Sequence, residues 1–264
     1  IAGVINIVLK SQVNETQLST SVGTTSEGDG DLISGSANTG FALGDGGFLN
    51  LSVEARRRGE TNRAGIDSLR VDPPRVTQRI GDSLAKDAFL WWNAAIPMDK
   101  DSELYAFGGV SKRTGDSAGF FRSAGDGRTV PAVYPDGFLP NILTTVKDAS
   151  FAVGYRRDLA NEWKFDTSVT HGRSEIGFHE RNSINVSYWY EPKPGGGIYA
   201  ESPLEADTGK LKFDQTTFNA DLRGPMDLGG RKVSVATGFE YRSDNYAIEA
   251  GDPVSYQYGR TNNP

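Results

Sequence analysis

The connections between segments of alternating apolar and polar residues differ in length in a regular way along the chain. Short turns rich in Gly and Asp join the two segments of a hairpin, whereas long polar stretches rich in Gly and Pro separate successive hairpins. A membrane-spanning β-barrel sorts its connections in this way, because its turns are short on one side of the membrane and its loops are long on the other. The short turns are 44–47, 98–102, 157–161 and 224–230, and the long segments are 59–85, 115–147, 181–211 and the tail from 249, with 26–30 as a shorter loop.

Composition limits the classes of protein that remain. Apolar residues make up 37% of the 264 residues and the mean hydropathy is -0.46, so the chain offers no helix that could span a lipid bilayer. A β-barrel tolerates this composition, since only alternate residues of each strand face lipid. The chain has no cysteine, which excludes disulfides and thiolate metal sites, and a net charge of -6 argues against nucleic acid as a partner.

The period-2 alternation predicts nine strands after an apolar run at 1–10 and a polar linker at 11–14. The run at 1–10 alternates little, and we expect it to be a strand that is buried on both sides. The fold class is therefore all-β: an antiparallel up-and-down transmembrane β-barrel, partial, with short turns at one end of the strands and long loops at the other. The predicted strands are 15–25, 31–43, 47–58, 86–97, 102–114, 148–157, 161–180, 212–223 and 231–248.

The segment 231–248 separates its two faces most cleanly. Val233 and Phe239 share one face, which suits lipid, while Lys232 and Glu240 share the other, which suits a water-filled lumen. A dry sandwich core would not tolerate charge on its inner face. An antiparallel sheet with one solvated face explains any single strand equally well and stays open as an alternative.

Aromatic residues gather near the short turns. Phe41 and Phe48 flank the first, Tyr105 follows the second, and Trp163 follows the third. An aromatic girdle at the headgroup level would place them there. Ordinary cross-strand pairing of aromatic side chains is the alternative.

The opening sequence IAGVINIVLK resembles the end of the plug domain of TonB-dependent outer-membrane receptors, in which a Gly-Val-Ile-Asn-Ile run precedes a basic residue and the first barrel strand. Two later segments, GFEYR at 238–242 and PDGFLP at 135–140, are similar to a barrel strand and a loop of these receptors. The resemblance implies that residues 1–14 are the C-terminal end of the plug domain with its linker. Residues 15–264 would then be the N-terminal part of a barrel of about 22 strands. The matching plug-end residues are Gly3, Val4, Ile5, Asn6, Ile7 and Lys10.

The same resemblance implies that the short turns are periplasmic and the long loops extracellular, and it also implies a function. The protein would be a receptor in the outer membrane of a Gram-negative bacterium that binds a scarce nutrient, such as siderophore-bound iron, cobalamin or a carbohydrate. It would import this nutrient with energy from the TonB complex, which would act through the region N-terminal to this segment. The implied partners are outer-membrane lipid, the TonB complex and a small nutrient ligand, and neither a cofactor nor an enzymatic activity is expected.

Candidate ligand-binding residues lie in the long loops, where rigid aromatic rings and arginines suit stacking and polar contacts. Packing of the aromatic rings against neighbouring loops is the open alternative. His171 and His179 share a face but lie too far apart to hold one metal ion, and no spacing of Ser, His or carboxylates suggests a catalytic group. The loop candidates are Arg122, Arg128, Tyr134, Tyr188, Trp189 and Tyr190.

Two other classes of protein remain to be distinguished. A secreted soluble β protein that binds glycans would need a second sheet over the face that carries Val233 and Phe239. A polysaccharide-acting enzyme would need two carboxylates that converge at about 5–10 Å. The basic run at 56–58 is expected to contact anionic lipid headgroups or loop carboxylates.

Overall fold

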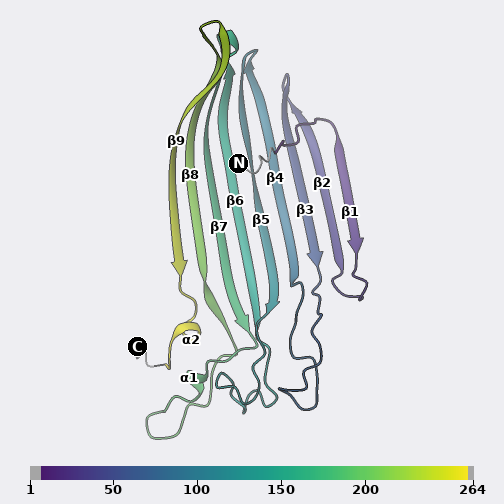
Figure 1. Ribbon diagram of the computed structural model, residues 1–264, viewed down its shortest axis with the longest axis vertical. Helices are drawn as coiled ribbons and strands as arrows, with labels where there is room; N and C mark the ends of the chain where they lie inside the picture. Colours follow the sequence, from purple (N-terminus) through teal and green to yellow (C-terminus); the bar gives the residue numbers. More distant parts are fainter. Residues whose placement is uncertain (1–6, 261–264) are drawn as a thin grey trace.

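The computed structural model describes residues 7–260, and in this range the chain is all β apart from three short helical segments. The strands follow one another in sequence order within a single antiparallel sheet (Figure 1). The predicted all-β, up-and-down antiparallel arrangement is confirmed. The described elements are β1 (Thr16–Gly23), β2 (Leu32–Leu43), β3 (Gly47–Arg58), β4 (Leu84–Asp99), β5 (Ser102–Ala118), β6 (Asn141–Asp158), η1 (Ala160–Glu162), β7 (Lys164–Arg181), α1 (Val186–Trp189), β8 (Glu205–Leu228), β9 (Arg231–Glu249) and α2 (Pro253–Tyr256).

Each of the nine predicted strands has a counterpart, but β6 and β8 begin seven residues earlier than predicted, at Asn141 and Glu205. Residues such as Asp207 and Gly209 have low strand propensity, so this part of β8 reads as a loop. Pairing with neighbouring strands overrides that preference, and a bulge opposite Phe178 and His179 absorbs one extra residue. The predicted loops 115–147 and 181–211 shorten to 119–140 and 182–204.

The short and the long connections between strands lie at opposite ends of the sheet, as expected. Residues 44–46, 100–101, 159–163 and 229–230 connect strands at one end of the sheet, and the long connections and the β1–β2 loop lie at the other (Figure 1). The two-residue turn between β8 and β9 places Gly229 and Gly230 at φ of 63° and 80°, which is the left-handed conformation that a type I′ hairpin turn requires. We call these two ends the short-turn end and the loop end.

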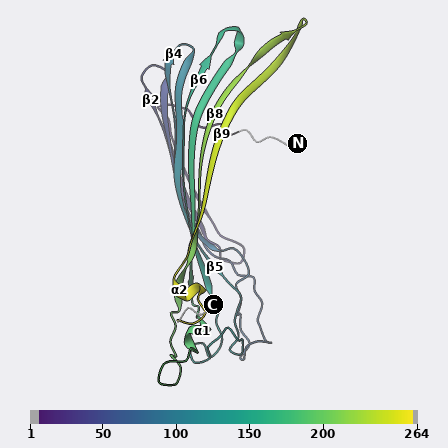
Figure 2. The same ribbon diagram turned by 90° about the vertical axis from the view of Figure 1, so that its left-hand side faces the viewer.

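The sheet is a single layer (Figure 2). Helices α1 and α2 lie among the loops at one end, so neither face of the sheet is covered by another element of the described chain. Only Ala95 and Ala152 are buried apolar residues of the strands, and the remaining buried apolar side chains lie in the loops and α1. The sheet is open, with β1 and β9 as its edges. Residues 7–260 contain no helix with the length and hydropathy needed to cross a membrane.

The segment before β1 differs from the expected buried strand. Residues 7–10 form no strand, and the side chains of Ile7 and Val8 are 78% and 82% exposed. No neighbouring strand pairs with them, and a strand needs such a partner for its backbone groups. The predicted plug-end residues Gly3, Val4, Ile5 and Asn6 lie outside the described residues.

Candidate functional site

One face of the sheet is apolar over its middle, and we call it the apolar face. Residues directly opposite each other on paired strands share a face, so the register connects Val153 to Val169, Phe218 and Tyr241 in one row across β6–β9. Phe239, on the same face of β9, is 60% exposed. The face that the sequence assigned to lipid is therefore continuous across the strands and uncovered.

Charged residues mark both limits of the apolar region, which we call the apolar belt. On β6 the apolar face carries Lys147 toward the loop end and Arg157 toward the short-turn end, with only Ala149, Phe151, Val153 and Tyr155 between them. Ten residue steps of about 3.3 Å span about 33 Å along the strand. For strands tilted by about 40°, this corresponds to a height of about 25 Å, the height of the apolar band on outer-membrane barrels.

The opposite face, the polar face, carries ion pairs and hydrogen bonds between strands. The carboxylate of Asp87, whose side chain is 2% exposed, accepts hydrogen bonds from Arg56 on β3 and Arg113 on β5. Tyr105 donates a hydrogen bond to Asp166 at 2.7 Å. Of the basic run at 56–58, Arg56 therefore meets a carboxylate of the sheet on the polar face. The charge predicted for this face is therefore present and takes part in ion pairs and hydrogen bonds between strands.

The linker crosses the polar face. The Gln12 side chain donates a hydrogen bond to Asn38 Oδ1 at 2.6 Å, and the backbone carbonyl oxygen of Gln12 accepts one from the Asn50 side chain. Asn93 donates to the carbonyl oxygen of Lys10. At Gly40, a Cβ atom would lie 1.8 Å from the Gln12 carbonyl oxygen, so only glycine allows this close approach. The chain thus enters the sheet from its polar side.

A shallow groove of about 610 Å³ lies further along the polar face. Its floor includes Gly109 and Gly172, and the rings of Trp91 and Phe213 border it. A Cβ atom at Gly109 would lie 2.4 Å from the Trp91 ring, so the glycine makes room for this ring. A second hollow of about 910 Å³ lies at the short-turn end and is lined mainly by charged side chains.

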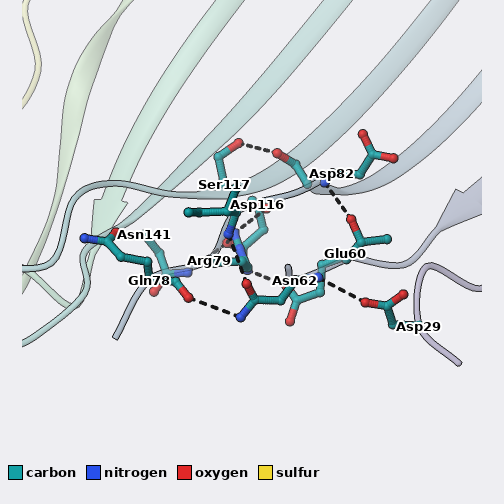
Figure 3. A network of polar contacts seen from close by, with 12 residues as sticks. Asp29, Glu60, Asn62, Gln78, Arg79, Asp82, Asp116, Ser117 and Asn141 are labelled. Carbon is teal, nitrogen blue, oxygen red and sulfur yellow. Dashed lines mark hydrogen bonds and ion pairs between the residues drawn. The ribbon is translucent and has the colours of Figure 1, made fainter. Parts of the chain in front are cut away.

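A polar network fastens the 59–83 loop to the strand ends (Figure 3). The Arg79 guanidinium forms ion pairs with Glu60 and with Asp116 of β5. Asp116 also accepts hydrogen bonds from Asn141 and Arg181, which begin β6 and end β7. One carboxylate thus links a loop to three strands.

A second clamp joins the 24–31 loop to the 59–83 loop. Arg63 donates two hydrogen bonds to the Asp29 carboxylate, at 2.6 and 2.9 Å. These bonds, followed by one from Thr25, hold the pKa of Asp29 well below its usual range. Burial opposes ionisation of Asp67, but hydrogen bonds from Thr77 and from backbone N–H groups outweigh it and lower the pKa to about 2. Both carboxylates are therefore structural groups of the loops.

Three of the candidate ligand residues lie in the 119–140 loop. The backbone of Arg122 pairs with Phe138 in an isolated bridge. Arg128 forms an exposed ion pair with Asp126, and this arginine lowers the pKa of the aspartate. Tyr134 stacks on Phe138 with ring centroids 4.2 Å apart and donates a hydrogen bond to the Ser183 carbonyl oxygen, and burial raises its pKa.

The aromatic cluster of the 182–204 loop divides into packed and exposed rings. Tyr188 is 8% exposed and donates a hydrogen bond to Gln257 at 3.0 Å. Trp189 is half-buried, whereas Tyr190 is exposed. Tyr188 therefore packs between loops, which is the alternative that the sequence left open. Tyr190 is exposed, so a ligand could contact it.

Arg260 is the residue at the loop end that sequence reasoning missed. Its guanidinium lies 4.4 Å from the Tyr199 ring centroid and 5.1 Å from that of Tyr188, and it donates to the Tyr188 carbonyl oxygen. An Arg near the C-terminal end of the sequence, more than sixty residues from its partners, carries no local signal. Together Tyr188 and Arg260 fix the tail against the 182–204 loop.

The two histidines lie on one face of β7, as their spacing predicts, opposite Phe151 and Leu143 of β6. His171 contacts Thr216 and His179 contacts Asp207, each at 2.9 Å. Across residues 7–260, no group of three His, Asp or Glu side chains is placed to hold a metal ion.

No family model, curated protein or solved structure matches this chain.

Proposed function

We propose that this chain is part of a TonB-dependent transport receptor of the outer membrane of a Gram-negative bacterium. The strands β1–β9 cross the membrane as one portion of a β-barrel, with the apolar face toward lipid and the polar face toward a water-filled lumen. Further strands pair with the free edges of β1 and β9 and close the barrel, since an open edge within lipid would leave backbone groups without partners.

The observation that carries this proposal is the uncovered apolar belt with charged residues at both limits. A face that exposes Val153, Phe218 and Phe239 together is unfavourable in water, because contiguous apolar patches on soluble monomers rarely exceed a few hundred Å². A soluble glycan-binding sheet would bury this face under a second layer, and no such layer lies on it within residues 7–260.

The linker supports the receptor class over a simple pore. Its hydrogen bonds to Asn38, Asn50 and Asn93 hold residues 10–12 against the polar face, which is the lumen in this proposal. The resemblance of residues 1–10 to the end of a plug domain agrees with this direction of entry. A plug inside the barrel would then connect to β1 through the linker.

In this orientation the short turns are periplasmic and the long loops are extracellular. The loops capture a small nutrient ligand, and the exposed Tyr190 and Arg128 are placed to contact it, while Arg122, Tyr134, Tyr188 and Trp189 shape the loops around them. Transport of the ligand through the lumen uses energy that the TonB complex supplies. The protein performs no covalent chemistry.

The proposal is tested in cells that produce the receptor and in cells from which its gene is deleted. Membrane fractionation should recover the protein with the outer membrane. Uptake of a panel of labelled ferric siderophores, cobalamin and oligosaccharides should fall for one compound in the deletion strain, and a protonophore should abolish that uptake in the parent strain. Recovery of the protein in the soluble fraction, or an unchanged uptake of every compound, would contradict the proposal.

A further inference from the structure

Four basic side chains form a compact group on the apolar face, and we call this group the basic patch. Arg57 on β3 lies directly opposite Lys86 on β4, and Lys112 on β5 lies directly opposite Lys147 on β6. All four are exposed. They lie at the loop-end limit of the apolar belt and extend over four neighbouring strands, a width of about 14 Å at about 4.8 Å per strand.

The pairing of these residues is unfavourable without a counter-charge. Directly opposite residues have Cβ atoms about 5 Å apart, and like charges at such positions destabilise a sheet. Lys86 and Lys112 are also diagonal neighbours, since Lys86 pairs with Thr114 and Ala88 pairs with Lys112. The patch thus concentrates four positive charges where sheets usually place opposite charges.

The protein supplies little compensation. Within residues 7–260, Arg57, Lys86 and Lys112 take part in no ion pair, and Lys147 reaches Glu175 only at 3.9 Å. The nearby carboxylate of Asp87 lies on the polar face between two other arginines.

On the rest of the apolar face, at the same level along the strands, positive charges are compensated by carboxylates. On β8, Lys212 forms ion pairs with Glu249 and Glu175, so the corresponding level of β7–β9 is neutralised within the protein. The excess positive charge is therefore confined to the part of the face that β3–β6 form.

The row beneath the basic patch shows what chemistry fits it. Val53, Leu90 and Val110 are opposite one another in that row and are exposed. A partner that matches both rows has an anionic head and apolar tails. Arginine binds phosphate through two parallel hydrogen bonds, and lysine acts as a point charge.

We propose that the basic patch binds the phosphate headgroup of an outer-leaflet lipid whose acyl chains lie on Val53, Leu90 and Val110. This inference rests on the proposed function, because the apolar face must be in a bilayer. The bound phosphate offsets the repulsion between the paired cations, and it fixes the depth of β3–β6 in the membrane.

The experiment titrates the complete receptor that contains this chain, in dodecylmaltoside micelles, with dioleoyl phosphatidic acid and counts bound lipids by native mass spectrometry. Dioleoyl phosphatidylcholine and inorganic phosphate serve as separate arms. Each basic residue near an anionic lipid surface contributes about 1 kcal/mol. The double variant Lys112→Gln with Lys147→Gln should therefore bind phosphatidic acid about 30-fold more weakly, and the affinity of the unmodified chain should fall as salt is raised.

Two variants control for loss of folding and for net charge. Lys112→Arg with Lys147→Arg should keep the affinity. Lys164→Gln with Lys232→Gln removes the same charge from the polar face near the short turns and should leave the affinity unchanged. Equal binding of the two lipids, equal affinity for inorganic phosphate alone, or equal losses in both double Gln variants would overturn the inference. Failure of the complete receptor, with the strands that close the barrel, to float with phosphatidylcholine vesicles would instead overturn the proposed function, and this inference with it.

Discussion

A charge placed in the middle of the apolar belt should destabilise the protein strongly in a bilayer. Val153 lies on β6 six positions from Lys147 and four from Arg157, and its side chain is half exposed on the uncovered face. An Arg near the midplane of the lipid-facing side of a barrel costs about 2–4 kcal/mol, and the cost falls toward the interfaces. Val153→Arg should therefore lower the free energy of unfolding by about that amount.

Ser150→Arg is the matched control. Ser150 lies on the same strand but on the polar face, between Gly109 and Gly172, where the groove leaves room for a long side chain. A change that stays in water should alter stability by no more than about 0.5 kcal/mol. Both variants would be measured by urea titration of the complete receptor folded into phosphatidylcholine vesicles, with tryptophan fluorescence as the probe. Equal losses for the two variants, or a larger loss for Ser150→Arg, would refute the assignment of the faces.

Three further outcomes are expected. Because hydrogen bonds lower the pKa of Asp67 from 3.8 to about 2, its ionised form stabilises the loop above about pH 4, and this contribution is lost as the pH falls through about 2. Asp67→Asn should therefore reduce hydrogen-exchange protection of the loop at pH 7 and reduce it much less at pH 2, where half of the carboxylate is protonated, and an equal effect at both values would contradict the linkage. Asn38→Leu removes the acceptor for Gln12 and leaves the linker more sensitive to limited proteolysis, whereas unchanged cleavage would show that the linker is held elsewhere. Tyr188→Phe loses one hydrogen bond and should cost about 1 kcal/mol in urea unfolding, while the exposed Tyr190→Phe should cost nothing measurable; equal effects would exclude the difference in their packing.

The sequence was sufficient to predict the strands of the sheet, because the alternation of apolar and polar residues can be recognised within each short segment. The order, direction and faces of β1–β9 follow from period-2 runs such as the one in β9, and from the Gly-rich turns that separate them. The early starts of β6 and β8 did not follow, since residues such as Asp207 join the sheet through pairing with another strand rather than through their own preference.

The candidate site depended more on contacts between distant residues. Sequence reasoning placed Tyr188, Trp189 and Tyr190 together, but only the geometry distinguishes the buried Tyr188 from the exposed Tyr190. The link of Arg79 and Arg181 to Asp116 joins residues 37 and 65 positions apart, and many other charges would have been equally plausible partners. Successive side chains of a strand point to opposite faces, so the basic run at 56–58 has Arg56 on the polar face and Arg57 in the basic patch.

The most direct test of the central claim is an accessibility scan along β9 by electron paramagnetic resonance. Residues 1–264 contain no cysteine, so a single cysteine introduced at each position from 233 to 241 of the complete receptor can carry one spin label after reconstitution in phosphatidylcholine vesicles. If the apolar face lies in lipid and the polar face in water, labels at Val233, Val235 and Phe239 collide mainly with oxygen dissolved in lipid. Labels at the even-numbered positions collide mainly with a water-soluble nickel chelate. Water exposure on both faces, or an absence of the period-2 pattern, would contradict this assignment of the faces.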